Sequence, residues 1–144
     1  MDILLRAATE ADHPFLWTLA REANRDVVTR QFGGWDDVWQ RRRFESKLPG
    51  SAYRIVSWEP TSVGAIWSVE HDDHFFIQQL LVLPVFQNRG IGSQLLRGEC
   101  AAARAVGKGV RLHTLKMNRA VTFYLRHGFV VTGRDDTFID MQLA

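Results

Sequence analysis

The sequence feature that most restricts the fold is a short segment with two glycines, QNRGIG, at residues 87–92. Before it, residues 75–83 form an apolar run of strand-forming residue types, and Pro84 follows. After it, apolar residues recur at helical spacing from Ile91 to Val106. Glycine tolerates positive φ and leaves space for another molecule beside the backbone. The segment therefore predicts a strand, a glycine loop and a helix in direct succession.

The start of a helix after such a loop is suited to bind an anion. Its first N–H groups have no acceptor within the helix, and the helix dipole adds partial positive charge there. Gly90 and Gly92 have no Cβ that would keep an anion from the backbone. The side chains of Gln87, Asn88 and Arg89 add hydrogen-bond donors. The segment lacks the Lys-Ser/Thr pair of a Walker loop and the third glycine of a dinucleotide fingerprint. We predict a diphosphate site, with a glycine helix entry that binds no ligand as the alternative.

The rest of the chain alternates between strand-like and helix-like runs without a repeat or a linker, so we expect one domain over residues 1–144. Strands are predicted at 3–8, 52–58, 62–70, 75–83 and 110–115, with a final hairpin around 133–136. Helices are predicted after the start signal 9–12, over 35–48, from about 90 to 106, and over 118–127. This order indicates an α+β fold with an antiparallel meander and one strand–helix–strand crossover.

Composition excludes several classes of protein. The chain is 46% hydrophobic and 24% charged, which is ordinary for a soluble domain. A single cysteine, Cys100, rules out an internal disulfide, and its place on the apolar side of a helix argues against a nucleophilic role. No apolar run reaches membrane-spanning length and the first residues lack a signal-peptide pattern, so we expect a cytoplasmic protein that binds no membrane. A net charge of +2, with acidic residues around Arg41–Arg43, does not indicate nucleic-acid binding and favours a solvated helix face, with a basic groove for a small polyanion as the alternative.

Two stretches resemble the signatures of one protein family. Residues 80–96, LLVLPVFQNRGIGSQLL, resemble the pyrophosphate motif of the GNAT superfamily of N-acetyltransferases. Residues 115–129, LKMNRAVTFYLRHGF, resemble its second signature, an asparagine followed by an aromatic-tyrosine pair and Gly-Phe. The two lie in the family's order, and the alternation of elements matches over essentially the whole chain. The resemblance implies a mixed, mostly antiparallel sheet of six to seven strands with about four helices. In that fold the fourth and fifth strands splay apart.

The resemblance also implies acetyl-CoA as co-substrate and assigns residues to it. Main-chain groups of Leu80, Leu81 and Val82 would hold the pantetheine arm and polarise the acetyl carbonyl. The pyrophosphate would be wrapped by Gln87, Asn88, Arg89, Gly90, Ile91, Gly92 and Ser93. Asn118 would touch the pantetheine and Arg126 would approach the nucleotide end, although Asn118 stands six residues before Tyr124 where many relatives have seven. No metal is implied.

For the chemistry, the resemblance points to Tyr124 as the general acid that protonates the leaving thiolate. The alternative is that its ring is only the aromatic face of a helix. The general base is open: Gln78 and Gln79 on the fourth strand cannot take a proton, and His113 on the fifth is the candidate by position and ordinary pKa. Glu70, His71, His74, a water relay and an amine that arrives neutral are the alternatives. The sequence HDDH at 71–74 is too short a turn to aim four ligands at one metal ion.

The amine acceptor should bind near the first two helices, with Gln79 from the fourth strand. Trp35, Trp39, Asp36 and Asp37 could form an aromatic and acidic pocket for an ammonium group. Core packing of the tryptophans and helix capping by Asp36 are the alternatives. Residues 34–44, GWDDVWQRRRF, also resemble a pattern of a bacterial subgroup of the family. A small-molecule amine, a peptide amino terminus and a lysine all remain candidate acceptors. A module that binds acyl-CoA without turnover is the alternative function, and a homodimer is compatible with the sequence.

Overall fold

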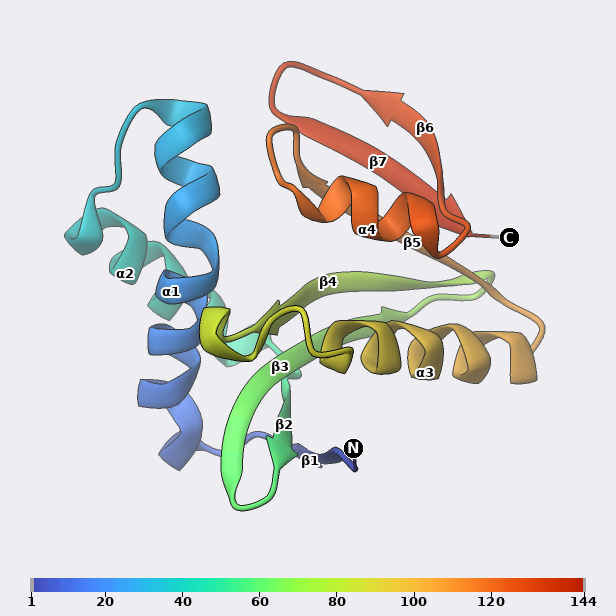
Figure 1. Cartoon of the computed structure of the whole chain (residues 1–144), viewed down its shortest axis with the longest axis horizontal. Helices are drawn as coiled ribbons and strands as arrows, with labels where there is room; N and C mark the ends of the chain where they lie inside the picture. Colours follow the sequence, from blue (N-terminus) through green and yellow to red (C-terminus); the bar gives the residue numbers. More distant parts are fainter. Residues whose placement is uncertain (1, 144) are drawn as a thin grey trace.

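The computed structural model describes residues 2–143 and is built around a seven-stranded sheet of order β1-β2-β3-β4-β5-β7-β6 (Figure 1). The strands are β1 (Leu4–Ala7), β2 (Arg54–Trp58), β3 (Thr61–Glu70), β4 (His74–Val82), β5 (Gly109–Leu115), β6 (Val130–Arg134) and β7 (Phe138–Leu143). The helices are α1 (His13–Phe32), α2 (Asp37–Lys47), α3 (Ile91–Ala105) and α4 (Ala120–Arg126). The predicted α+β fold, its strand and helix numbers and its glycine-loop crossover are confirmed.

The two N-terminal helices begin and end at residues suited to those positions. Asp12 directly precedes α1 and Pro14 lies in its first turn, where a missing N–H does no harm. Gly33, at φ 84°, ends α1 in the left-handed conformation and donates to the Thr29 carbonyl. The Asp36 carboxylate accepts the Trp39 N–H at 3.0 Å, which caps α2. Asp36 therefore caps a helix, as the alternative to a role in the acceptor pocket predicted.

The two halves of the sheet meet at β4 and β5, and there the sheet divides. Strands β1 to β4 form the predicted antiparallel meander, and β5, β7 and β6 are antiparallel to one another. β4 and β5 are parallel, but their pairing runs only from His74–Gly109 to Ile77–Leu112. Beyond that point the strands separate, which confirms the predicted splay. β4 also carries a bulge there, because Gln79 pairs with Trp67 and Ile77 pairs with Ser68.

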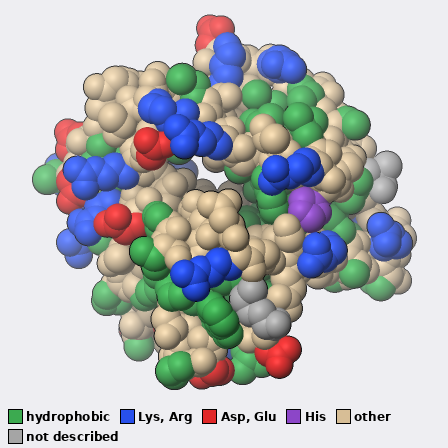
Figure 2. Space-filling view, in the orientation of Figure 1, with side chains coloured by type: hydrophobic (Ala, Val, Ile, Leu, Met, Phe, Trp, Pro, Cys, Tyr) green, Lys and Arg blue, Asp and Glu red, His purple; other side chains and the backbone are tan. Residues whose placement is uncertain are grey.

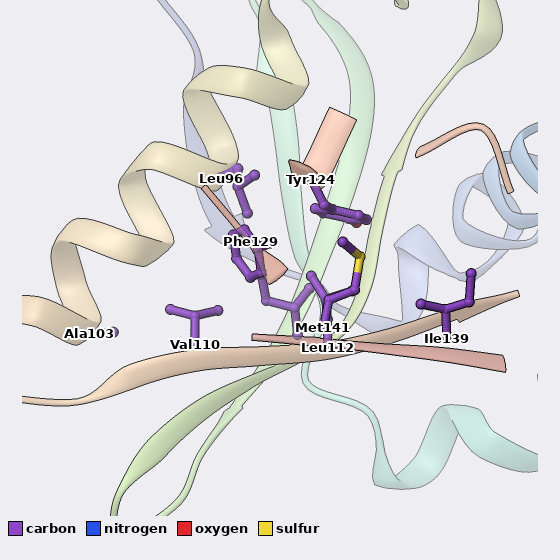
Figure 3. Close-up of a cluster of buried hydrophobic side chains, with 9 residues drawn as sticks. Leu96, Ala103, Val110, Leu112, Tyr124, Phe129, Ile139 and Met141 are labelled. Carbon is purple, nitrogen blue, oxygen red and sulfur yellow. The ribbon is translucent and has the colours of Figure 1, made fainter. Parts of the chain in front are cut away.

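Alternate residues of the strands bury opposite faces of the sheet. Ile55 and Leu81 pack with α1 and α2, whereas their neighbours Val56 and Val82 pack with the start of α3. Figure 1 shows α3 and α4 in front of the sheet and α1 with α2 together at its side. A third cluster joins α3 and α4 to β5 and β7 (Figure 3); its labelled members are Leu96, Ala103, Val110, Leu112, Tyr124, Phe129, Ile139 and Met141.

Polar contacts tie the parts of the sheet together. Glu99 of α3 is 6% exposed, and its carboxylate binds Arg54 of β2 and accepts the Ser68 hydroxyl of β3 at 2.9 Å. The Gln31 side chain of α1 accepts the Met117 N–H at 2.9 Å and donates to the Thr137 carbonyl at 2.8 Å. Gln31 therefore joins α1 to the half of the sheet beyond the splay.

None of the helices between residues 2 and 143 is both long and apolar enough to cross a membrane. Over the same residues, His, Cys, Asp and Glu side chains form no group of three or more that could hold a metal ion.

Candidate active site

The glycine loop has the geometry of an anion site. After β4 the chain makes one turn at Pro84–Phe86 and passes through two left-handed residues, Asn88 at φ 62° and Gly90 at φ 85°. Space beside Gly90 is open, since a Cβ placed there would have no atom within 4 Å. At Gly92 a Cβ would lie 3.5 Å from the Phe123 ring. Gly90 thus provides the backbone torsion and open approach, whereas a Cβ at Gly92 would make only an ordinary contact with Phe123 of α4.

The first N–H groups of α3 point out of the helix without partners in it. Intrahelical bonding begins where the Gln94 N–H reaches the Gly90 carbonyl at 3.0 Å, so the N–H groups of residues 91–93 are left over. Arg89 adds a guanidinium at the loop, 5.6 Å from the Phe86 ring centre. Unpaired N–H groups, positive charge and an open glycine together fit a diphosphate.

Two predicted loop donors have partners within the protein. The Gln87 side-chain amide donates to the Val82 carbonyl at 2.9 Å, which folds the loop back on the end of β4. The Ser93 hydroxyl lies 3.0 Å from Nε2 of His127. Burial lowers the pKa of His127, and Arg97 and Arg126 add to this effect. Arg126 itself is exposed on α4.

A cavity of about 500 Å³ opens where β4 and β5 separate. Its floor comes from both strands, Ile77–Leu81 of β4 and Leu112–Leu115 of β5, and α4 supplies Tyr124. The opposite wall belongs to α1, α2, the segment 48–53 that precedes β2, and Trp67 of β3. Figure 2 shows the molecule hollowed between the α1 side and the α4 side, with Lys and Arg side chains around the rim. The cavity therefore connects the two faces of the sheet through the splay.

Tyr124 is both a core residue and a cavity residue. It is 7% exposed, and its ring packs with Phe123 and Phe129 at centroid distances of 5.3 and 5.7 Å (Figure 3). Its hydroxyl has no hydrogen-bond partner within residues 2–143, but the oxygen is not fully buried, because Tyr124 lines the cavity. Burial raises the pKa of Tyr124 to about 12, so the phenol is protonated at neutral pH. The ring of Tyr124 thus packs in the core, as in the alternative that makes it the aromatic face of its helix, and its hydroxyl is still free for a ligand.

Asn118 lines the cavity and also starts α4. Its side-chain carbonyl accepts the Ala120 N–H at 2.9 Å, and its amide donates to the Thr114 hydroxyl at 2.9 Å. Leu80 and Leu81 line the cavity, whereas Val82 is buried beside α3. At the neighbouring Gly64 of β3, a Cβ would lie 2.4 Å from the Leu81 carbonyl oxygen. Only glycine lets β3 approach this part of β4.

His113 lies at the cavity on the side of the sheet opposite Leu112. It is exposed, and its ring stacks on Phe138 at 4.6 Å with an interplanar angle of 6°. The other base candidates, Glu70, His71 and His74, do not line the cavity; Glu70 binds Lys108 at 2.6 Å. His113 is therefore the base candidate that the fold brings into one cavity with Tyr124. Cys100 lies outside this cavity, and burial raises the pKa of its thiol.

The predicted acceptor residues divide into two groups. Trp35 and Gln79 line the cavity, and Trp35 stacks on Trp17 at 6.4 Å. Asp36, Asp37 and Trp39 do not line it. Asp36 caps α2, and Asp37 accepts the Trp35 indole N–H at 3.0 Å.

The sequence reasoning missed several cavity residues: Trp17, Asn24, Gln40, Arg43, Phe44, Lys47, Tyr53 and Trp67. Four of these residues could have been grouped from the sequence, because the spacing of Gln40, Arg43, Phe44 and Lys47 places them on one face of α2. The acidic residues Asp36, Asp37 and Glu45 beside the basic run Arg41–Arg43 instead favour a solvated helix face.

Comparisons with known proteins show the family and the fold. Residues 51–131, more than half of the chain, match the family model described as an acetyltransferase (GNAT) domain. No curated protein matches the chain.

Three solved structures illustrate the similarity of fold. A PaiA N-acetyltransferase from Thermoplasma acidophilum, in complex with coenzyme A, is 19% identical with a TM-score of 0.79 over 99% of this chain and 98% of that one. The ribosomal-protein-S18-alanine N-acetyltransferase of Escherichia coli is 15% identical with a TM-score of 0.71 over 99% and 93%. Arabidopsis thaliana Naa50, with the bisubstrate analogue CoA-Ac-MVNAL, is 17% identical with a TM-score of 0.70 over 100% and 99%. The chain belongs to the GNAT acetyltransferase family and is an acetyl-CoA-dependent N-acetyltransferase.

Proposed function

We propose that this protein transfers an acetyl group from acetyl-CoA to a primary amine by direct attack in a ternary complex, with Tyr124 as general acid. The observation that carries the proposal is the cavity at the β4–β5 splay, which joins the Tyr124 side of the sheet to the α1–α2 side. Two substrates that enter from opposite faces can meet there without a covalent enzyme intermediate. The half-buried Cys100 outside the cavity supplies no rival nucleophile.

On the cofactor side, the N–H groups of residues 91–93 and Arg89 hold the diphosphate of acetyl-CoA. Acetyl-CoA supplies an activated acetyl thioester. The unpaired edge of β4 after Ile77 offers main-chain groups to the pantetheine and to the acetyl carbonyl, which develops negative charge during attack. Asn118 has one amide hydrogen left after its bond to Thr114, and this hydrogen would be donated to the same arm.

The proton steps follow from the two cavity groups. The amine nitrogen forms a bond to the acetyl carbon while the carbon–sulfur bond breaks, and the electron pair leaves on sulfur. Tyr124 donates its hydroxyl hydrogen to that sulfur, and His113 accepts the proton that the amine loses. The His113 ring, stacked on Phe138, stays at the α1–α2 side, where the amine enters.

Transfer is tested by incubating the protein with acetyl-CoA and a panel of primary amines that includes amino acids, polyamines and peptides. Release of free thiol and formation of acetylated amine are measured together. We expect thiol release to depend on the amine and to match product formation in amount. Tight binding of acetyl-CoA with no release for any amine would instead identify an acyl-CoA-binding module.

A further inference from the structure

The α2 wall of the cavity carries positive charge that no carboxylate of the protein neutralises. Arg43 and Lys47 both line the cavity, and no Asp or Glu among residues 2–143 does so. Neither cation forms an ion pair within that range, and the nearby Glu45 binds Arg41 instead, at 2.8 Å. The cavity therefore offers two unpaired cations to whatever enters from this side.

Without a ligand, the positions of Arg43 and Lys47 destabilise α2. They stand four residues apart on one face of α2, where like charges repel and weaken a helix. Burial lowers the pKa of Lys47, and the charge of Arg43 adds to the effect. Both side chains are exposed, so they stand at the open rim of the cavity, and the Arg43 guanidinium lies 5.6 Å from the ring centre of Trp39, which does not line the cavity. A bound anion would remove the repulsion.

Beside the polar residues Asn24 and Gln40, this wall carries four aromatic side chains. Trp17 and Trp35 stack at 6.4 Å, and Tyr53 and Trp67 lie 5.4 Å apart between centroids. All four line the cavity. Burial raises the pKa of Tyr53 to about 12, so this phenol adds no negative charge at neutral pH. The wall therefore combines an apolar surface with two cations.

We infer that the acceptor is a primary amine that also carries an anionic group, a carboxylate or a phosphate, on an apolar body. The anion binds Arg43, whose planar guanidinium can pair with two oxygens, and Lys47. The apolar body lies on the aromatic wall, and the amine reaches His113 and Tyr124. The inference rests on the proposed function and deepens it. Its charge preference is opposite to the one predicted from Asp36 and Asp37, which lie outside the cavity.

The kinetic test uses pairs of amines that differ in one anionic group: phenylalanine with phenylalaninamide, and O-phosphoethanolamine with ethanolamine. We expect kcat/KM to be about tenfold or more higher for the anionic member of at least one pair, and which pair responds separates carboxylate from phosphate. Arg43→Gln and Lys47→Gln should each reduce that preference through KM. Arg42→Gln makes the same charge change at an exposed α2 position outside the cavity and should retain it. Equal kcat/KM within both pairs, or a preference for the neutral or cationic amines, overturns the inference.

A binding test does not depend on turnover. Protein saturated with CoA is titrated calorimetrically with N-acetylphenylalanine, its amide, and N-acetyl-O-phosphoethanolamine. We expect an anionic product to bind about tenfold or more tightly than the amide, and Arg43→Gln to abolish the difference. Anionic binding through Arg43 without thiol release from any amine would refute the proposed function and leave the charge preference standing. Failure of both anionic products to bind overturns the inference, whatever the turnover.

Discussion

Replacement of Tyr124 by phenylalanine separates the two roles of this residue. The ring packs with Phe123 and Phe129 and is kept in the variant, while the hydroxyl has no partner within residues 2–143. Removing an unpaired hydroxyl leaves no donor or acceptor unsatisfied in the protein. We therefore expect the melting temperature of Tyr124→Phe to equal that of the wild type or exceed it, while turnover falls.

The size of the turnover loss follows from the raised pKa of Tyr124. At about 12, it lies above the ordinary thiol pKa of about 8.5, so complete proton transfer to a thiolate is uphill. In the transition state the phenol then acts mainly as a hydrogen-bond donor to the charged sulfur, and its proton is transferred only as the thiol is released. Such a bond contributes about 1.5–3 kcal/mol, which corresponds to about a 10- to 150-fold loss of kcat. Complete proton transfer in the transition state would give about a 10²- to 10⁴-fold loss.

The assay is thiol release at saturating acetyl-CoA and amine, with acetyl-CoA affinity measured separately. Tyr53→Phe is the comparator, because Tyr53 is the other buried tyrosine and its pKa is also raised to about 12 by burial. We expect Tyr124→Phe to lower kcat far more than Tyr53→Phe, with little change in acetyl-CoA affinity. Unchanged kcat in Tyr124→Phe would show that Tyr124 has only a packing role.

Three further predictions test the loop, the tyrosines and the buried ion pair. Gly90→Asp should abolish the rise in melting temperature that acetyl-CoA causes, whereas Gly90→Asn, which tolerates the same positive φ without the charge, should keep part of it; equal losses would rule out phosphate repulsion. Folding raises the pKa values of Tyr53 and Tyr124 from 10 to about 12. The stability that the two protonated phenols contribute is therefore complete below pH 10 and falls as pH rises through 12. Chemical denaturation across this range should show the fall in the free energy of unfolding, and the fall should be smaller in Tyr124→Phe. Glu99→Ala should lower the free energy of unfolding by about 1–3 kcal/mol, because Arg54 and Ser68 lose their shared partner; Arg41→Ala, which breaks the exposed pair with Glu45, should cost under about 1 kcal/mol.

Local patterns were enough to predict the elements and the phosphate loop. The strand, the two glycines and the helix of residues 75–106 are adjacent in sequence, so spacing alone indicated β4, the left-handed Gly90 and the free N–H groups of α3. The turn at Pro49–Gly50 and the meander of β2 to β4 depend on neighbours in the chain as well. These features follow from torsional preferences and hydrogen bonds between residues close in sequence.

The acceptor wall was decided by packing between elements that are distant in the chain. α2 reads as a charged, solvated helix, and only its position against the splay turns Arg43 and Lys47 toward a cavity with Tyr124, about eighty residues away. The sequence suggested Asp36 and Asp37 as residues that bind the amine. In the structure the Asp36 carboxylate accepts the main-chain N–H of Trp39, and the Asp37 carboxylate accepts the indole N–H of Trp35. Sequence by itself determined the fold and the conformation of the glycine loop, because these depend on local geometry. Tertiary structure decided which charges line the cavity, because the side of a surface helix that lines a cavity is set by the elements it packs against.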